Sequence, residues 1–256
     1  QHHIQLKTAL LISMANYKYI FDVDGTLTPS RGKIDPQFAR WFMDFCAKHA
    51  VYLVTGSDYS KTKEQLGEEL LQLPVTVYNC SGNDVWQQGV RIRTNHWSMP
   101  DEVREFLAER LKASEFVLRT GEHFDVRPGS VNFSIVGRGA TLKERALYKE
   151  WDQHTGERNR LVCDFDEKFG ADLEIAAGGE TGVDIYPRGR NKSQILEDFD
   201  QHSDIVLFFG DCMDPRGNDF ELAHRLRHSG WQGKNYSVAD WQHTWCILQE
   251  LHPITG

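Results

Sequence analysis

Two aspartates directly after the first apolar run of the chain could carry phosphoryl-transfer chemistry. Asp22 and Asp24 follow residues 19–21, and Gly25 then allows a sharp turn. Two carboxylates at the end of a buried strand repel each other, so burying them is costly unless a cation lies between them. A divalent metal would supply that charge and could also bind phosphate oxygens. Asp22 is therefore a candidate nucleophile and Asp24 a candidate general acid/base, with an ordinary Asp-Gly turn as the alternative.

Thr55 and Lys192 are candidates for holding a phosphate near these aspartates. Thr55 follows a second apolar strand at residues 51–54, and its hydroxyl and the amides around it could bind a phosphate oxygen. Lys192 lies at the start of a predicted helix, where its ammonium could neutralise both a phosphate and Asp22. Taken separately, Thr55 could be an ordinary helix N-cap and Lys192 an ordinary surface lysine.

Two further aspartates lie at the end of a later apolar strand. Asp211 follows residues 205–209, and Asp219 comes one short loop later. Carboxylate oxygens are hard ligands that suit Mg²⁺, although turn residues are the alternative for each of them alone. The carboxyl ends of parallel strands share one edge of a sheet, so the order of these residues along the chain predicts a single site.

The elements that must position this site alternate between strand and helix. Asp35 and Pro36 open a helix with apolar residues at Phe38, Phe42 and Phe45. The alternation predicts a parallel, doubly wound sheet. The predicted strands lie near residues 17–21, 51–54, 75–78, 205–209 and 236–238, and the predicted helices start near residues 36, 61, 192 and 220.

The pattern changes between residues 87 and 187, where alternating strands are separated by glycines. This segment predicts an α+β unit inserted into the first domain. The division is thus a core domain at 4–86 and 188–256 and a cap domain at 87–187. Within the cap we expect helices at 100–111 and 141–151, and strands at 90–93, 116–119, 123–127, 131–136, 173–176 and 183–186.

Composition narrows the function classes. The chain has 256 residues, of which 40% are hydrophobic and 26% charged, and a net charge of -8 that disfavours a broad nucleic-acid surface. Its five scattered cysteines lack C-x-x-C spacing, which indicates a reducing compartment rather than disulfides or structural zinc. The apolar stretch at residues 6–14 is too short to span a membrane and predicts a short helix or the approach to the first strand. We expect a cytoplasmic protein without nucleic-acid or membrane partners.

The motifs resemble the haloacid dehalogenase (HAD) superfamily and, within it, the eukaryotic-type phosphomannomutases. The resemblance runs from about residue 17 to near the C-terminus. It is carried in the core by Phe21-Asp22-Val23-Asp24-Gly25-Thr26-Leu27-Thr28-Pro29, Lys33-Ile34-Asp35-Pro36, Gly56-Ser57-Asp58-Tyr59, Glu64-Gln65-Leu66-Gly67, Phe208-Phe209-Gly210 and Gly217-Asn218-Asp219-Phe220-Glu221. In the cap it is carried by Arg127, Asn132, Gly137-Arg138, Glu144-Arg145, and Asp184 with Tyr186-Pro187.

The resemblance implies a Rossmann-like HAD core with a C2-type cap, and a role for each matching residue. Asp22 would be the nucleophile, and Asp24 the acid/base that also helps to hold Mg²⁺ through its backbone. The implied Mg²⁺ site is Asp22, Asp24, Asp211 and Asp219. The implied substrate-binding residues are Arg31, Arg127, Asn132, Arg138, Arg145 and Asp184. Without the resemblance, the seven-residue spacing of Arg138 and Arg145 would favour a solvated basic face.

The expected function is a phosphohexomutase that interconverts mannose 6-phosphate and mannose 1-phosphate through an aspartyl phosphate, with a hexose bisphosphate as activator. Pairing of two chains through their caps is typical of the family. Three positions differ from it, because Gly182 replaces a cap serine, Thr55 a glycine and Asp211 an asparagine. The changes at Thr55 and Asp211 are both toward the usual HAD phosphatase pattern. A sugar-phosphate phosphatase that uses the same nucleophile is therefore the alternative. A phosphosugar-binding module without activity is a third reading, which the complete set of acidic and basic site residues disfavours.

Overall fold

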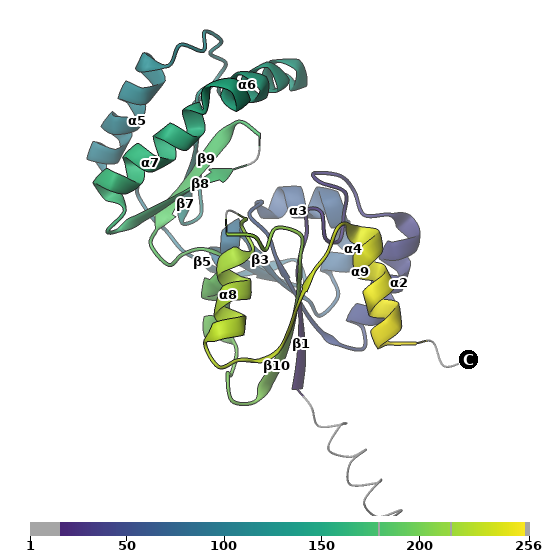
Figure 1. Cartoon of the computed structure of the whole chain (residues 1–256). Coiled ribbons are helices and arrows are strands. Elements are labelled where there is room, and N and C mark those ends of the chain that lie inside the picture. Colours follow the sequence, from purple (N-terminus) through teal and green to yellow (C-terminus); the bar gives the residue numbers. More distant parts are fainter. Residues whose placement is uncertain (1–15, 179, 216, 254–256) are drawn as a thin grey trace, which may run out of the picture. The chain divides into compact units, whose positions relative to one another are not determined.

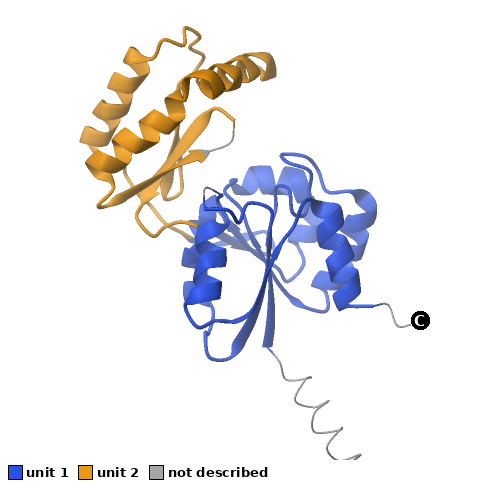
Figure 2. Cartoon of the chain, in the orientation of Figure 1, with its two compact units in different colours: residues 1–93, 192–256 blue, residues 94–191 orange. Residues whose placement is uncertain are grey.

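The computed structural model describes residues 16–178, 180–215 and 217–253, and the chain forms two compact units (Figure 2). Unit 1 comprises residues 1–93 and 192–256, and unit 2 comprises residues 94–191. The boundary expected at residue 87 lies at 94 because the strand expected at 90–93 joins the sheet of unit 1. The helix or approach expected at residues 6–14 lies outside the described residues.

Unit 1 is built on a seven-stranded sheet in the order β11-β10-β1-β2-β3-β4-β5 (Figure 1). The first five strands in that order are parallel, which confirms the predicted doubly wound sheet, and β4 returns antiparallel to β3. Their bounds are β1 (Asn16–Asp22), β2 (Ala50–Val54), β3 (Thr76–Asn79), β4 (Asp84–Gln87), β5 (Val90–Thr94), β10 (Asp204–Gly210) and β11 (Gln232–Ser237).

Helices cover both faces of this sheet. One face carries α2 (Pro36–Cys46), α3 (Tyr59–Leu66), α4 (Glu68–Leu71) and α9 (Trp241–Leu251), whose apolar side chains form a cluster with Phe21 and Phe209. The other face carries the 3₁₀ helix η2 (Lys192–Asp198) and α8 (Phe220–His228), which pack on Ile20, Val206 and Phe208. Two apolar layers around one sheet fix the strand ends that bear the predicted site.

Several local predictions can be compared with these helices. The helix from Pro36 is confirmed, with Asp35 Oδ1 accepting from the amide of Gln37 at 2.8 Å. The helix expected at 61–71 is two helices, because Gly67 has φ = +83° and breaks the hydrogen-bond ladder. The helix expected after Lys192 is a 3₁₀ helix, and α9 was not predicted.

Unit 2 is an antiparallel sheet with helices on one face. Its order is β6-β7-β9-β8, with β6 (Phe124–Arg127), β7 (Ser130–Ser134), β8 (Leu173–Gly178) and β9 (Gly182–Pro187). Val131 and Phe133 pack in one apolar cluster with α5 (Asp101–Ala113), α6 (Leu142–Thr155) and α7 (Glu157–Phe169). Side chains alternate between faces along a strand, so the neighbouring polar residues of β7 point to the opposite, helix-free face.

One predicted strand of unit 2 is wrong, and one helix of unit 2 was not predicted. Residues 116–119, expected as a strand, form irregular chain in which Phe116 is buried. Helix α7 was not predicted, because only Leu161 and Phe165 are buried, among many charged residues.

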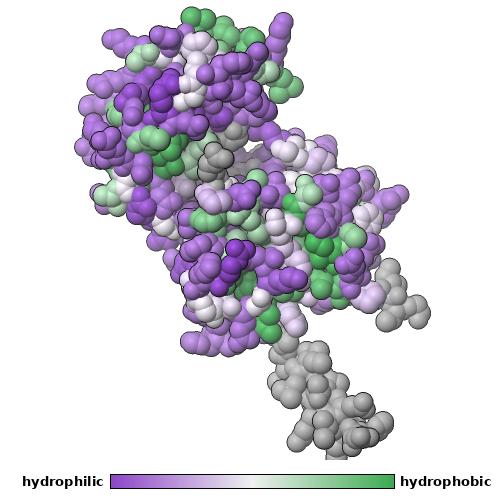
Figure 3. Space-filling model, viewed as in Figure 1, coloured by the Kyte–Doolittle hydropathy of each residue, from purple (hydrophilic) through white to green (hydrophobic). Residues whose placement is uncertain are grey.

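The face of the molecule seen in Figure 3 is mainly polar. Figure 3 shows mainly hydrophilic residues on the visible face, with hydrophobic ones in scattered groups. Among the described residues, no helix is both long enough and apolar enough to cross a membrane.

Candidate active site

The Asp22–Asp24 turn separates two carboxylates that are close in sequence. Asp22 ends β1, and the amides of Leu27 and Thr28 both donate to the carbonyl of Val23, at 2.9 and 3.1 Å. Gly25 adopts φ = +75°, and a side chain there would collide with the carboxylate of Asp211, so this position requires glycine for two reasons. The turn leaves Asp22 buried and Asp24 partly exposed, so the two carboxylates have different surroundings.

Lys192 joins three segments of unit 1 through one buried ammonium group. Its Nζ lies 2.5 Å from Oδ1 of Asp22 and 2.8 Å from Oδ1 of Asp219. The three side chains are at most 3% exposed. Asp219 also accepts from the backbone amide of Cys212 at 3.1 Å, which fixes the loop before α8. The predicted neighbourhood of Asp22, Lys192 and Asp219 is thus present.

The cluster holds more negative than positive charge. Asp22, Asp211 and Asp219 each offer one carboxylate oxygen, and these oxygens lie within 4.8 Å of one another. Burial raises the pKa of Asp22 well above its usual value, and the Lys192 ammonium opposes that shift. Desolvation lowers the pKa of Lys192, but the two carboxylates that it contacts outweigh desolvation and raise this pKa. Three hard oxygen donors facing one ammonium fit a divalent cation, which would relieve the repulsion among them.

Asp24 makes contacts that differ from those of the acidic cluster. Its Oδ1 accepts from the backbone amide of Arg31 at 2.5 Å and from Nε2 of Gln65 at 2.9 Å. The Arg31 side chain is exposed, so the link that the structure provides between these two predicted residues is a backbone one. The carboxylate of Asp24 does not belong to the group formed by Asp22 and the other two aspartates.

Gln65 is a site residue that the sequence reasoning missed. It is 1% exposed and projects from α3, where Thr62 and Leu66 are also buried. Besides Asp24, its Nε2 lies 3.3 Å from the Thr28 hydroxyl. The available signal was a glutamine on the buried side of an amphipathic helix, because buried amides need hydrogen-bond partners.

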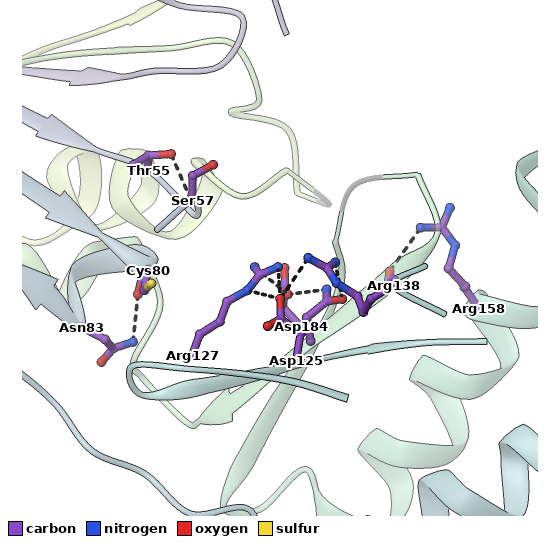
Figure 4. Close-up of polar contacts among 11 residues, drawn as sticks. Thr55, Ser57, Cys80, Asn83, Asp125, Arg127, Arg138, Arg158 and Asp184 are labelled. Carbon is purple, nitrogen blue, oxygen red and sulfur yellow. Dashed lines mark hydrogen bonds and ion pairs between the residues drawn. The ribbon is translucent and has the colours of Figure 1, made fainter. Parts of the chain in front are cut away.

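Thr55 lies one residue beyond Val54, which is the register partner of Asp22 in the adjacent strand. Thr55 is 1% exposed, and its hydroxyl accepts from the backbone amide of Ser57 at 3.1 Å (Figure 4). The strand-end location predicted for Thr55 is therefore confirmed.

Five polar side chains on the helix-free face of the unit 2 sheet form a closed ring of contacts (Figure 4). Arg127 donates to Oδ2 of Asp125 from Nε at 3.0 Å and from Nη2 at 2.9 Å, and its Nη1 lies 3.7 Å from Oδ1 of Asp184. Arg138 Nη2 contacts the same Asp125 oxygen at 3.0 Å, and Nη1 donates to Oδ1 of Asn132 at 3.3 Å. Asn132 Nδ2 closes the ring at Oδ1 of Asp184, at 2.7 Å. We call these residues the cap ring.

The cap ring brings together four of the predicted substrate-binding residues. Asn132 and Asp184 are direct register partners in β7 and β9, which explains their contact. Arg145, also predicted, lies in the first turn of α6 and is partly exposed, outside the ring. Asp125 was missed, and its signal was a carboxylate two residues before Arg127, on the same face of one strand.

Solved structures of a hydrolase and a phosphatase have the same fold as this chain. The structure superimposes with TM-score 0.60 on a haloacid dehalogenase-like hydrolase from Bacteroides thetaiotaomicron, at 10% identity over 92% of this chain and 99% of that one. A trehalose-6-phosphate phosphatase from Aspergillus fumigatus gives a TM-score of 0.56 at 17% identity, over 89% of this chain and 84% of that one. At such identities the likeness establishes the fold, and it confirms the predicted HAD-like α/β core.

Sequence comparison identifies the family as well as the fold. Residues 38–252 match the family model described as eukaryotic phosphomannomutase. Phosphomannomutase 1 from Homo sapiens is 33% identical over 213 residues, which cover 79% of this chain and 81% of the relative. Phosphomannomutase from Galdieria sulphuraria is 31% identical over 223 residues, which cover 82% and 86% respectively. This chain belongs to the eukaryotic phosphomannomutase family of HAD enzymes.

Proposed function

We propose that this protein is a Mg²⁺-dependent phosphohexomutase that interconverts mannose 6-phosphate and mannose 1-phosphate through an aspartyl phosphate on Asp22. The observation that carries the proposal is the buried contact of Asp22 with Lys192, beside two further carboxylates. A carboxylate in that setting is positioned as a nucleophile, and the ammonium stabilises charge that develops on a phosphoryl group. The names of the relatives supply the mutase reaction and its sugar.

The two half-reactions use Asp22 and Asp24 in opposite directions. In the first, an oxygen of Asp22 bonds to the phosphorus of a hexose bisphosphate, the bond from phosphorus to the sugar oxygen breaks, and Asp24 gives that oxygen a proton. In the second, a hydroxyl of the bound hexose phosphate gives its proton to Asp24 and attacks the phosphorus, and the bond to Asp22 breaks. Gln65 and the Arg31 amide hold Asp24 in place for both proton transfers.

Asp22, Asp211 and Asp219 would hold the Mg²⁺ ion, with the backbone of Asp24 as a further donor. When bound, the ion supplies positive charge that offsets the negative charge of the transferring phosphoryl group. In unit 2, Arg127 and Arg138 would bind phosphate, because a guanidinium fork matches phosphate oxygens, and Asp184 would accept from sugar hydroxyls. Arg145 would add a third arginine from α6.

Phosphorus NMR tests the proposal with mannose 1-phosphate, Mg²⁺ and a trace of hexose bisphosphate. Mannose 6-phosphate as the main product, with little inorganic phosphate, is the expected result. Inorganic phosphate as the main product would replace the mutase by the phosphatase alternative, in which water takes the phosphoryl group from Asp22. No conversion of either kind would contradict both functions.

A further inference from the structure

Gly182 provides the space that the Asn132 side chain occupies. The two residues are diagonal neighbours, because Ser134 pairs with Gly182 and Asn132 pairs with Asp184. A Cβ atom added to Gly182 would lie 2.7 Å from Nδ2 and 2.9 Å from Oδ1 of Asn132. The carboxamide of Asn132 therefore lies over the Cα of Gly182, and even alanine at position 182 would have to displace it.

The backbone of Gly182 is anchored by a hydrogen bond, which a movement of the backbone away from Asn132 would strain or break. Its carbonyl accepts from Nη1 of Arg158 at 3.2 Å (Figure 4). Arg158 is itself fixed by Asp152, with Nε to Oδ2 at 2.7 Å and the backbone amide to Oδ1 at 2.8 Å. The side chains of Arg158 and Asp152 are 16% and 11% exposed, so this anchor is largely buried. Any crowding at position 182 is consequently relieved at Asn132.

Asn132 is suited by its chemistry to join the two halves of the cap ring. It is 4% exposed, donates to the Asp184 carboxylate and accepts from the Arg138 guanidinium. A carboxamide offers a donor and an acceptor on one planar group, whereas a carboxylate there would repel Asp184 and an ammonium would repel Arg138. The Asn132 and Arg127 contacts both use Oδ1 of Asp184.

We infer that Gly182 is a specificity-determining position and that Asn132 is a positioning residue: together they set the separation between the Arg138 guanidinium and the Asp184 carboxylate. The inference rests on the proposed function, in which these groups bind the phosphate and a hydroxyl of one hexose phosphate. A fixed separation selects sugar phosphates whose hydroxyl reaches Asp184 while the phosphate engages Arg138. Phosphate esters without a sugar do not use this link.

A double-mutant cycle of Gly182→Ala and Asn132→Ala tests the inference, with mannose 1-phosphate and p-nitrophenyl phosphate as the two substrates. Each single change is expected to raise KM for mannose 1-phosphate by roughly 10-fold or more, with a smaller effect on kcat. In the Asn132→Ala background, Gly182→Ala is expected to add less than about 2-fold, because its target side chain is gone. The KM for p-nitrophenyl phosphate, which lacks a sugar hydroxyl, should rise less than the KM for mannose 1-phosphate in each of the three variants.

Three outcomes would overturn the inference: multiplicative KM effects in the double variant, an unchanged KM in Gly182→Ala, or an equal loss on both substrates. The last of these would indicate general damage to the fold, which thermal unfolding of each variant measures independently. A crystal structure of Gly182→Ala gives a readout that does not depend on turnover. An unmoved Asn132 there would refute the mechanism even if the wild-type protein proves inactive on mannose phosphates, whereas that inactivity alone would refute only the proposed function.

Discussion

The acidic cluster of unit 1 and the cap ring of unit 2 are both networks of opposite charges, but they differ in burial. Lys192 and Asp22 expose 1% and 3% of their side chains, whereas Arg138 and Asp184 expose 38% and 35%. Charges that are buried interact strongly and are expensive to leave unpaired, while half-exposed pairs are screened by water and exchange partners readily. For the proposed function, this difference suits a preorganised reaction centre in unit 1 and, in unit 2, a binding surface whose ion pairs a ligand would replace.

The largest expected effect is on turnover in Asp22→Asn. An amide cannot form the aspartyl phosphate, so kcat should fall by about 10⁴-fold or more. The same change removes one buried negative charge from a cluster that has too many, so the free energy of unfolding should not decrease. Urea unfolding alongside the kinetic assay checks both halves. Substantial residual turnover would contradict the covalent mechanism.

Lys192→Met tests the buried acidic cluster through its effect on the free energy of unfolding. Methionine has a similar length but leaves Asp22, Asp211 and Asp219 without their ammonium, which should lower the free energy of unfolding by about 3–5 kcal/mol in the presence of a chelator. Added Mg²⁺ should recover part of this loss, because the cation takes over the neutralising role. A loss below about 1 kcal/mol would mean that the buried cluster behaves like an exposed ion pair.

Arg138→Ala is the matched experiment in the cap ring. We expect the free energy of unfolding to change by less than about 1 kcal/mol, because the guanidinium is half-exposed. Affinity for mannose 1-phosphate should fall by about 2 kcal/mol, or roughly 30-fold, if the arginine grips the phosphate.

Arg110→Ala serves as the control for Arg138→Ala. Arg110 is also a half-exposed arginine of unit 2, paired with Asp164 at 2.9 Å, and it lies outside the cap ring. The KM of the Arg110→Ala variant for mannose 1-phosphate should equal that of the wild-type protein. Equal KM values in Arg138→Ala and Arg110→Ala would mean that Arg138 does not bind substrate and is part of a solvated basic face.

The residues that could be predicted from the sequence are those whose signal is local. Asp22, Thr55 and Asp211 each follow an apolar strand, and parallel strands bring their carboxyl ends to one edge without further information. The break at Gly67 also has a local signal, the low helix propensity of glycine, which the prediction of one helix over 61–71 did not use. The 3₁₀ form of the segment after Lys192 has no comparable signal in the sequence.

The missed site residues need knowledge of which neighbours they meet. Gln65 acquires its role only because α3 packs beside the Asp24 turn. Asp125 joins the predicted Asn132 in one ring only through the strand register of unit 2. The clash at Gly182 likewise exists only once β7 and β9 are paired, so no pattern within either strand could reveal it.

The smallest expected effect is a pH dependence of stability that involves neither cluster. His49 and His252 have ring centroids 4.6 Å apart beside Phe45, and Nε2 of His252 lies 2.9 Å from the Tyr19 hydroxyl. Burial lowers the pKa of both histidines, and for His49 the charges of His252 and Lys48 lower it further.

The sign of the effect follows from proton counting. Between the lowered pKa values and the usual value of about 6.5, the unfolded chain binds more protons than the folded one, so stability falls as the pH drops through that window. Urea unfolding between pH 5 and pH 8 should show this decrease, and His49→Phe should reduce its slope while keeping the aromatic packing on Phe45. An unchanged slope in His49→Phe would assign the pH dependence to other groups. The carboxylates of the two charged clusters would then be the next groups to test.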